Sequence, residues 1–194
     1  MVDLSMSSLG AIADGILDEI KRAISSLEAD QVEKMISMIM GLRDHRIFVV
    51  GAGRSGLIGR AFAMRLMHLG FNVYVVGETI TPAFEKGDLL LAISGSGTTT
   101  SVIDAAKASK KIGGKVLVIT SYPGSPLGRI ADHNVVLKSK TKLGEGTEAQ
   151  RFSAPLGTLF EASCLVFLDS IVVELMRRLS KTEEDMKRMH STIE

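Results

Sequence analysis

The sequence predicts an α/β protein in which a doubly wound, five-stranded parallel sheet forms the middle of three layers, preceded by an N-terminal helical hairpin. The first 42 residues repeat apolar positions every three or four residues, as amphipathic helices do. From residue 46 onward, short apolar runs alternate with helix-length segments, which is the order of a parallel sheet with crossover helices. Two of these runs end in glycine- and hydroxyl-rich loops, at the edge where open α/β sheets bind ligands.

The hairpin is expected to consist of a helix over residues 5 to about 26 and a second helix after it. The apolar stripe of the first helix consists of Leu9, Ile12, Ile16, Ile20, Ala23 and Leu27. Asp30 followed by Glu33 resembles a capping box, so the second helix is expected to begin there and to end at Gly41. The apolar faces of both helices exceed what covering one sheet requires, and burial between subunits is the expected outlet.

Apolar runs bounded by glycine or polar residues are expected to be strands buried on both faces. They span residues 46–50, 72–76, 88–94, 115–120 and 133–137. Helix-like segments between them span residues 55–69, 98–111 and 125–131. Strands and helices that alternate in this way predict a parallel sheet covered on both faces.

Residues 138–155 are polar with two glycines and are expected to form a surface or active-site loop. A strongly apolar helix is expected over residues 156–179, and a short final helix is expected to begin at Thr182. We therefore expect a single domain over residues 1–194. Its parts are the N-terminal helices (1–42), an α/β core (46–180) and a C-terminal helix and tail (182–194).

The composition excludes several classes of partner. The chain is 45% hydrophobic and 23% charged with a formal net charge of +1, and it has no polybasic run, so neither nucleic acid nor an anionic membrane is an expected partner. The acidic N-terminus differs from a signal peptide, and the longest apolar runs are far shorter than the roughly 20 residues that span a bilayer. A cytosolic protein is expected. The single cysteine, Cys164, lies in an apolar run and is expected to be a buried core residue.

The loops GAGRSG (51–56) and SGSGTTTS (94–101) each follow a predicted strand and open a helix. Glycines allow backbone N–H groups to face a ligand, and a helix N-terminus adds unpaired donors, so an anion is the expected guest. The first loop matches the dinucleotide fingerprint, and Glu78 lies about where a ribose-binding acid would stand. From this loop alone, NAD and a single phosphate are comparable candidates.

The second loop favours the phosphate. Its hydroxyl residues are Ser94, Ser96, Thr98, Thr99, Thr100 and Ser101. Such a cluster suits three phosphate oxygens at one point, whereas a turn and an N-cap would need only one or two hydroxyls. Neither loop continues into the G-K-[ST] of a P-loop, which disfavours ATP hydrolysis.

Five segments in this order resemble a known family. They are GAGRSG, AFAMRLMHLGF (61–71), VGETITP (76–82), SGSGTT and PLGTLFE (155–161). The chain resembles the 6-phospho-3-hexuloisomerases of the sugar isomerase (SIS) domain class, from about residue 40 to the end, including Arg188 and His190 near the C-terminus. The resemblance implies the SIS fold, which is flavodoxin- or Rossmann-like.

The resemblance also implies an activity, the interconversion of D-arabino-3-hexulose 6-phosphate and D-fructose 6-phosphate in the ribulose monophosphate route. It implies a homotetramer with sites near subunit contacts and no metal or nucleotide cofactor. Matching the motifs makes Glu161 the proton-transferring base. The implied phosphate ligands are Ser55, Ser94, Ser96 and Thr99. Further phosphate or substrate contacts are expected from Gly53, Arg54, Gly95, Gly97, Glu78 and Thr79.

Moving a carbonyl from C3 to C2 through an enediol needs one positioned carboxylate, which could be Glu161. Glu161 shares a helical face with Leu165, Leu168 and Val172, although an acid in a first turn can also serve only the helix dipole. His190 is a second candidate, because an imidazole can protonate a ring oxygen or polarise a carbonyl near neutral pH. The other histidines are His45, His68 and His133, and no pair has metal-ligand spacing.

Three alternatives remain open at this point. Another SIS isomerase could act on a different aldose or ketose phosphate, and a non-catalytic SIS module could sense a sugar phosphate. A nicotinamide-dependent oxidoreductase would rest on GAGRSG and Glu78 alone. The segments 61–71 and 76–82 favour the hexulose phosphate isomerase over these alternatives.

Overall fold

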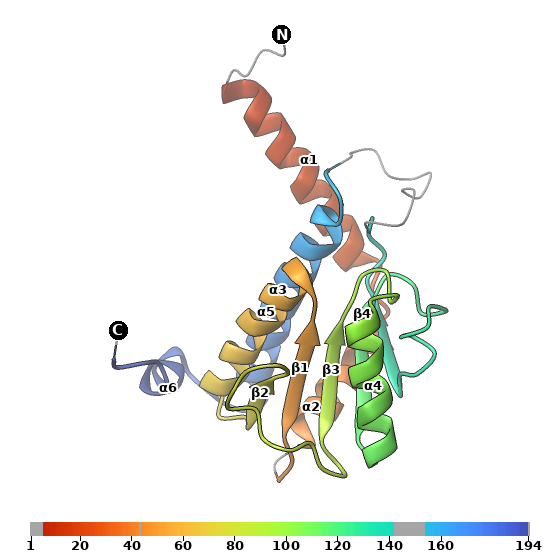
Figure 1. Ribbon diagram of the computed structural model, residues 1–194. Helices are drawn as coiled ribbons and strands as arrows, with labels where there is room; N and C mark the ends of the chain where they lie inside the picture. The colour runs from red at the N-terminus through yellow and green to blue at the C-terminus, as the bar shows by residue number, and fades with distance from the viewer. Residues whose placement is uncertain (1–5, 43, 142–153, 194) are drawn as a thin grey trace.

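The computed structural model describes residues 6–42, 44–141 and 154–193. Its centre is a five-stranded parallel sheet with the strand order β2-β1-β3-β4-β5 (Figure 1). The strands are β1 (Ile47–Gly51), β2 (Val73–Val75), β3 (Leu89–Ile93), β4 (Lys115–Thr120) and β5 (His133–Val136). Each strand falls on one of the apolar runs, so the predicted α/β class is confirmed.

Helices cover both faces of the sheet (Figure 1). They are α1 (Met6–Ser25), α2 (Ala29–Met40), α3 (Gly53–His68), α4 (Thr100–Ile112), α5 (Thr158–Arg178) and α6 (Glu183–Arg188). On one face, Met35 of α2, Phe62 of α3 and Phe167 of α5 share a buried cluster with the strands. On the other face, Val102 and Ala106 of α4 pack on the sheet. The three layers are therefore α, β and α.

The order in which the chain adds strands to the sheet reverses at β1. This strand pairs with β2 on one side and with β3 on the other, in parallel register with both. The helices that follow β1 and β3, namely α3 and α4, lie on opposite faces of the sheet. In open α/β sheets such a switch point leaves a crevice outside the carboxyl ends of the two central strands, so a ligand is expected beyond β1 and β3.

The connection from β4 to β5 differs from its prediction. Residues 125–131 form turns rather than a short helix. Pro123 and Pro126 fix the backbone and lack N–H donors, and a Cβ at Gly128 would lie 2.2 Å from the carbonyl oxygen of Pro123. The Arg129 N–H donates to the Ser125 carbonyl oxygen and the Ile130 N–H to that of Leu127, both at 3.0 Å, so the chain forms turns that do not continue into a helix. Leu127 is buried in the core.

The prediction that Asp30 and Glu33 form a capping box at the start of the second helix is wrong. The helix begins at Ala29, with Glu28 at the N-cap position and no side-chain cap, so Asp30 already lies in the first turn. Glu33 does not reach back to the helix start but accepts hydrogen bonds from both terminal nitrogens of Arg178 on α5, at 2.6 and 2.7 Å. The acid therefore links two helices instead of capping one.

The helix α2 also covers the edge strand β5. The Gln31 side chain accepts a hydrogen bond from the backbone N–H of Val136 at 3.0 Å, and the Gln31 carbonyl oxygen accepts one from His133 Nε2 at 2.8 Å. These bonds occupy groups that an uncovered edge strand would offer to another chain.

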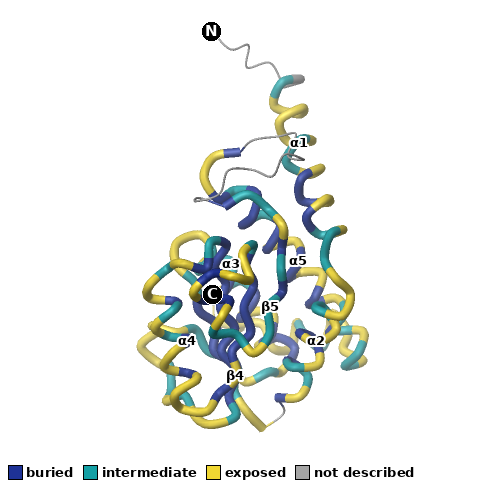
Figure 2. Tube along the Cα trace, turned by 90° about the vertical axis from the view of Figure 1, so that its right-hand side faces the viewer, coloured by how far each residue is buried: buried dark blue, intermediate teal, exposed yellow. Residues whose placement is uncertain are grey.

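The helix α1 projects beyond the rest of the molecule, and the C-terminal part of α1 packs on α5 (Figures 1 and 2). Ala23 is buried there, whereas Leu9, Ile12 and Leu17 are 59%, 44% and 60% exposed. The expected excess of apolar surface therefore exists on α1, while the apolar residues of α2 are buried in the core.

Two further sequence expectations bear on the fold. Cys164 is fully buried on α5 as predicted, and burial raises the pKa of its thiol above the usual range. Within the described part of the chain, no helix is long and apolar enough to cross a membrane. The predicted 138–155 loop lies largely outside the described residues.

Candidate active site

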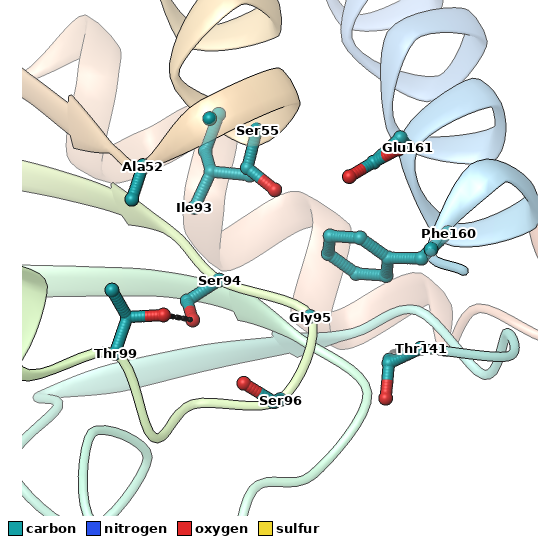
Figure 3. A pocket seen from close by; sticks show the side chains of 12 residues that line it. Ala52, Ser55, Ile93, Ser94, Gly95, Ser96, Thr99, Thr141, Phe160 and Glu161 are labelled. Atoms are coloured by element: carbon teal, nitrogen blue, oxygen red, sulfur yellow. Dashed lines mark hydrogen bonds between the residues drawn. The ribbon is translucent and has the colours of Figure 1, made fainter. Parts of the chain in front are cut away.

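A cavity of about 260 Å³ opens beyond the carboxyl ends of β1 and β3, at the switch point of the sheet. Both glycine loops and the start of α5 line it (Figure 3). Its lining residues are Ala52, Gly53, Ser55, Ile93, Ser94, Gly95, Ser96, Thr99, Thr141, Gly157, Phe160 and Glu161. Loops that lie 40 residues apart in the sequence thus meet in one place, as the phosphate-site prediction requires.

The loop after β3 is held by its own hydrogen bonds. The backbone N–H of Gly97 donates to Ser94 Oγ at 3.2 Å, and Ser94 Oγ lies 3.4 Å from Thr99 Oγ1 (Figure 3). Gly97 has φ +63°, and a Cβ there would lie 1.9 Å from Ser125 Oγ. Only glycine fits this left-handed position, so the curvature of the loop depends on it.

The helices that start at the cavity have no side-chain caps. Ala52, Thr99 and Gly157 occupy the N-cap positions of α3, α4 and α5, and none makes a side-chain capping hydrogen bond. Unpaired N–H donors and the positive ends of three helix dipoles therefore converge on the same space. This arrangement favours an anionic ligand.

Glu161 faces this space from the first turn of α5. Its side chain is only 6% exposed, and its carboxylate and the Ser55 hydroxyl point toward one another across the cavity (Figure 3). Leu168 and Val172, on the same helical face, are buried, whereas Leu165 is 40% exposed. The predicted apolar stripe is therefore buried at Leu168 and Val172, further along α5, but is interrupted at Leu165, the stripe residue nearest to Glu161.

The Glu161 carboxylate is bound by Arg54. Arg54 Nε lies 2.7 Å from Glu161 Oε2, and Arg54 Nη1 lies 3.5 Å from the Thr158 hydroxyl. Arg54 does not line the cavity, although its neighbour Ser55 does. The structure thus directs this cation to the candidate base and not to the hydroxyl loop.

Three of the expected site residues lie elsewhere. Glu78 and Thr79 follow β2, both exposed and outside the cavity lining, and Glu78 forms an ion pair with Arg60 of α3 at 2.9 Å. His190 is exposed and lines a different cavity between α3, α5 and α6, where its ring centroid lies 5.3 Å from that of His68. A single chain therefore does not bring His190 and Glu161 together.

Sequence reasoning did not identify two residues that shape the cavity. The Phe160 ring forms one wall beside Gly95, and Thr141 is buried against the same glycine. Thr141 does follow the predicted fifth strand, at the ligand-binding edge of the sheet, and this position could have indicated it. Phe160 resembles any core aromatic in sequence and carries no such signal.

Among the described residues, no three His, Cys, Asp or Glu side chains are grouped as metal ligands would be.

The fold and the cavity define a class of doubly wound α/β domains with a site for an anionic ligand beyond the central strands, and comparison with known proteins narrows this class. A family model described as the SIS domain matches residues 42–168, so the chain belongs to the SIS domain family.

Curated relatives narrow this assignment. A Bacillus subtilis protein named 3-hexulose-6-phosphate isomerase is 39% identical over 92% of this chain and 95% of its own length. A Methanocaldococcus jannaschii protein of the same name is 41% identical over 84% of each chain. A crystal structure from Methanococcus jannaschii, whose description infers 3-hexulose-6-phosphate isomerase function, superposes with a TM-score of 0.78 at 38% identity and covers 97% of this chain and all of its own. Within the SIS domain family, the chain belongs to the 3-hexulose-6-phosphate isomerases.

Proposed function

We propose that this protein interconverts D-arabino-3-hexulose 6-phosphate and D-fructose 6-phosphate. The observation that carries the proposal is a buried carboxylate, Glu161, across a small cavity from a hydroxyl-rich loop and three uncapped helix starts. A phosphate at the loop leaves the carbon chain of the sugar to extend toward the carboxylate. The names of the relatives support this substrate pair over other aldose or ketose phosphates.

In the proposed reaction, the loops bind the phosphate and Glu161 transfers the proton. Glu161 removes the proton from C2 of the 3-ketose while O3 gains a proton, which gives a C2–C3 enediol. The C2 hydroxyl then loses its proton as the carbonyl develops at C2, and Glu161 returns its proton to C3. C2 is oxidised and C3 is reduced by the same two electrons, so no net oxidation occurs. One carboxylate can serve both steps.

The phosphate ligands are proposed from the cavity lining. Hydroxyls would come from Ser55, Ser94, Ser96 and Thr99, and backbone N–H groups from Gly53 and Gly95. Gly97 is outside the cavity lining and its N–H donates to Ser94 Oγ, so it shapes the loop and is not proposed as a ligand. Thr99 supports this proposal most directly, because its hydroxyl faces Ser94 Oγ at the cavity and does not cap α4.

We further propose a homotetramer. Exposed apolar side chains on α1 and α5, such as Leu17 and Val173 at 60% and 66% exposure, support an assembly that covers both helices. In such an assembly His190 would act, if it acts at all, in the site of another subunit. Mixed oligomers of Glu161→Gln and His190→Ala chains test this: recovered activity supports a shared site, and a fully active His190→Ala protein removes His190 from the mechanism.

The assay for the substrate uses purified protein with formaldehyde, ribulose 5-phosphate and a hexulose phosphate synthase. Formation of fructose 6-phosphate is the expected result, and it would place the enzyme in the ribulose monophosphate route. Conversion of other sugar phosphates without fructose 6-phosphate would contradict the substrate assignment but not the fold.

A further inference from the structure

Arg54 is the second residue of α3, and its side chain extends from the GAGRSG loop toward α5. Its Nε lies 2.7 Å from Glu161 Oε2, while a terminal nitrogen lies 3.5 Å from the Thr158 hydroxyl. The two contacts come from one turn of α5, so the guanidinium spans the start of that helix. Successive helical residues point about 100° apart, which explains why Ser55 reaches the cavity and Arg54 does not.

The ion pair is asymmetric in burial. The Glu161 side chain is 6% exposed and the Arg54 side chain is 58% exposed. Among residues 6–42, 44–141 and 154–193, Arg54 is the only cation within 4.0 Å of this carboxylate. A buried carboxylate needs a hydrogen-bonding or charged partner, and the contact of Arg54 Nε with Glu161 Oε2 supplies one. The same contact fixes the orientation of the carboxylate at the wall of the cavity.

We infer that Arg54 is a positioning residue that keeps the Glu161 carboxylate aimed into the cavity, and that it is not a ligand of the substrate phosphate. This inference rests on the proposed isomerase function, in which Glu161 is the base. It differs from the sequence expectation for Arg54, which was a contact with the phosphate. The two roles predict different kinetics.

The test compares the steady-state kinetics of wild type, Arg54→Gln and Arg54→Lys. Loss of the guanidinium should lower kcat roughly 10- to 100-fold, because the base is misplaced, and should leave KM within about twofold. Arg54→Lys should recover part of kcat, since an ammonium supplies charge without the planar geometry.

The matched control is Arg177→Gln, at the far end of the same helix as Glu161. Arg177 also pairs with a glutamate, Glu174, and is 72% exposed, but it lies away from the cavity. Its replacement should leave kcat and KM unchanged. If Arg54→Gln instead raises KM and the inhibition constant of inorganic phosphate, with kcat unchanged, then Arg54 binds phosphate and the inference is wrong.

A measurement without turnover separates this inference from the proposed function. Carboxyl ¹³C labelling of glutamate, with the Glu161 signal assigned by its loss in Glu161→Gln, reports the surroundings of that side chain directly by NMR. At neutral pH the chemical shift of this signal should differ between Arg54→Gln and wild type, because the carboxylate loses its partner, whereas Arg177→Gln should leave it unchanged. If wild type converts no hexulose phosphate, the proposed function fails, yet this difference would still support the positioning role. An unchanged chemical shift in Arg54→Gln would overturn it.

Discussion

Thr99 is the residue that best separates a binding site from an ordinary helix start. A threonine at an N-cap normally accepts a hydrogen bond from the helix, whereas Thr99 Oγ1 lies 3.4 Å from Ser94 Oγ. Thr182 provides the contrast within the same chain, because it caps α6 with a complete capping box to Asp185. The same residue type thus caps the helix at α6 and instead pairs with a loop hydroxyl at the cavity at α4.

The hydroxyl loop depends on Gly97, and we predict the effect of replacing it. Gly97→Ala should raise KM for the sugar phosphate at least about tenfold and lower Tm by several degrees, because the new Cβ collides with Ser125 and the backbone is left-handed. Steady-state kinetics and thermal unfolding measure the two effects. Gly124→Ala is the control, since a Cβ there meets nothing within 4 Å; equal behaviour of both variants would contradict the account.

At the scale of single residues, the sequence predicted several residues that line the cavity but not which side chains pair with one another. Ser55, Ser94, Ser96, Thr99 and Glu161 all line one cavity, as motif and loop composition indicated. The pairing of Arg54 with Glu161 joins positions 107 residues apart in the sequence, and no local pattern encodes it. Such contacts depend on how helices are placed by the whole sheet.

Among the elements, α2 and α5 are joined by a charged network. Glu174 accepts hydrogen bonds from Arg177 and Arg178, which lower its pKa from an ordinary 4.5 to about 2. Arg178 also binds Glu33 of α2, and that hydrogen bond lowers the pKa of Glu33. The network connects the hairpin to the helix that carries Glu161.

This network predicts a pH dependence of stability. A carboxylate with a lowered pKa in the folded state stabilises the fold above its unfolded value, and this contribution is lost as the pH falls from about 4.5 toward 2. Glu174→Gln should therefore lower Tm near neutral pH, and its difference from wild type should shrink on acidification through that range. Differential scanning calorimetry checks this, with exposed Glu184→Gln as control. A difference that stays constant with pH would contradict the assignment.

The elements also mark where sequence reasoning failed. Apolar runs located all five strands, since a parallel strand has a strong and local signature. The expected burial on both faces holds for β1, β3 and β4, whereas the edge strands β2 and β5 are mostly half-buried. The segment 125–131 has helical spacing but also has proline and glycine before and within it, and the tight turn prevails. The capping box at Asp30 failed because Glu33 finds a stronger partner in Arg178, which is distant in sequence.

At the scale of the molecule, the strand order decides where the site lies. The reversal at β1 brings the loops after β1 and β3 together, and both are followed by long helices whose starts face the cavity. Alternation of strands and helices predicted a parallel sheet, but it does not specify the order of the strands. The dinucleotide fingerprint therefore predicted the glycine turn between β1 and α3 correctly. By itself it did not distinguish a dinucleotide from a single phosphate.

The exposed apolar surface gives a prediction about assembly. Leu17→Glu on α1 and Val173→Glu on α5 should each reduce the native mass from that of four chains, because a charge cannot be buried between subunits without a partner. Light scattering after size exclusion measures the mass, and circular dichroism checks the fold. Lys21→Glu, on an exposed position of α1, is the control. A tetramer unaffected by both substitutions would place the interface elsewhere.

The central claim is that Glu161 moves the proton in a sugar phosphate isomerisation. The most direct measurement is the steady-state conversion of D-arabino-3-hexulose 6-phosphate to fructose 6-phosphate by wild type and by Glu161→Gln. We predict that wild type forms fructose 6-phosphate and that the variant loses roughly 100- to 10,000-fold in kcat, with KM and Tm close to wild type. Near-normal turnover by the variant, or no fructose 6-phosphate from wild type, would contradict the claim.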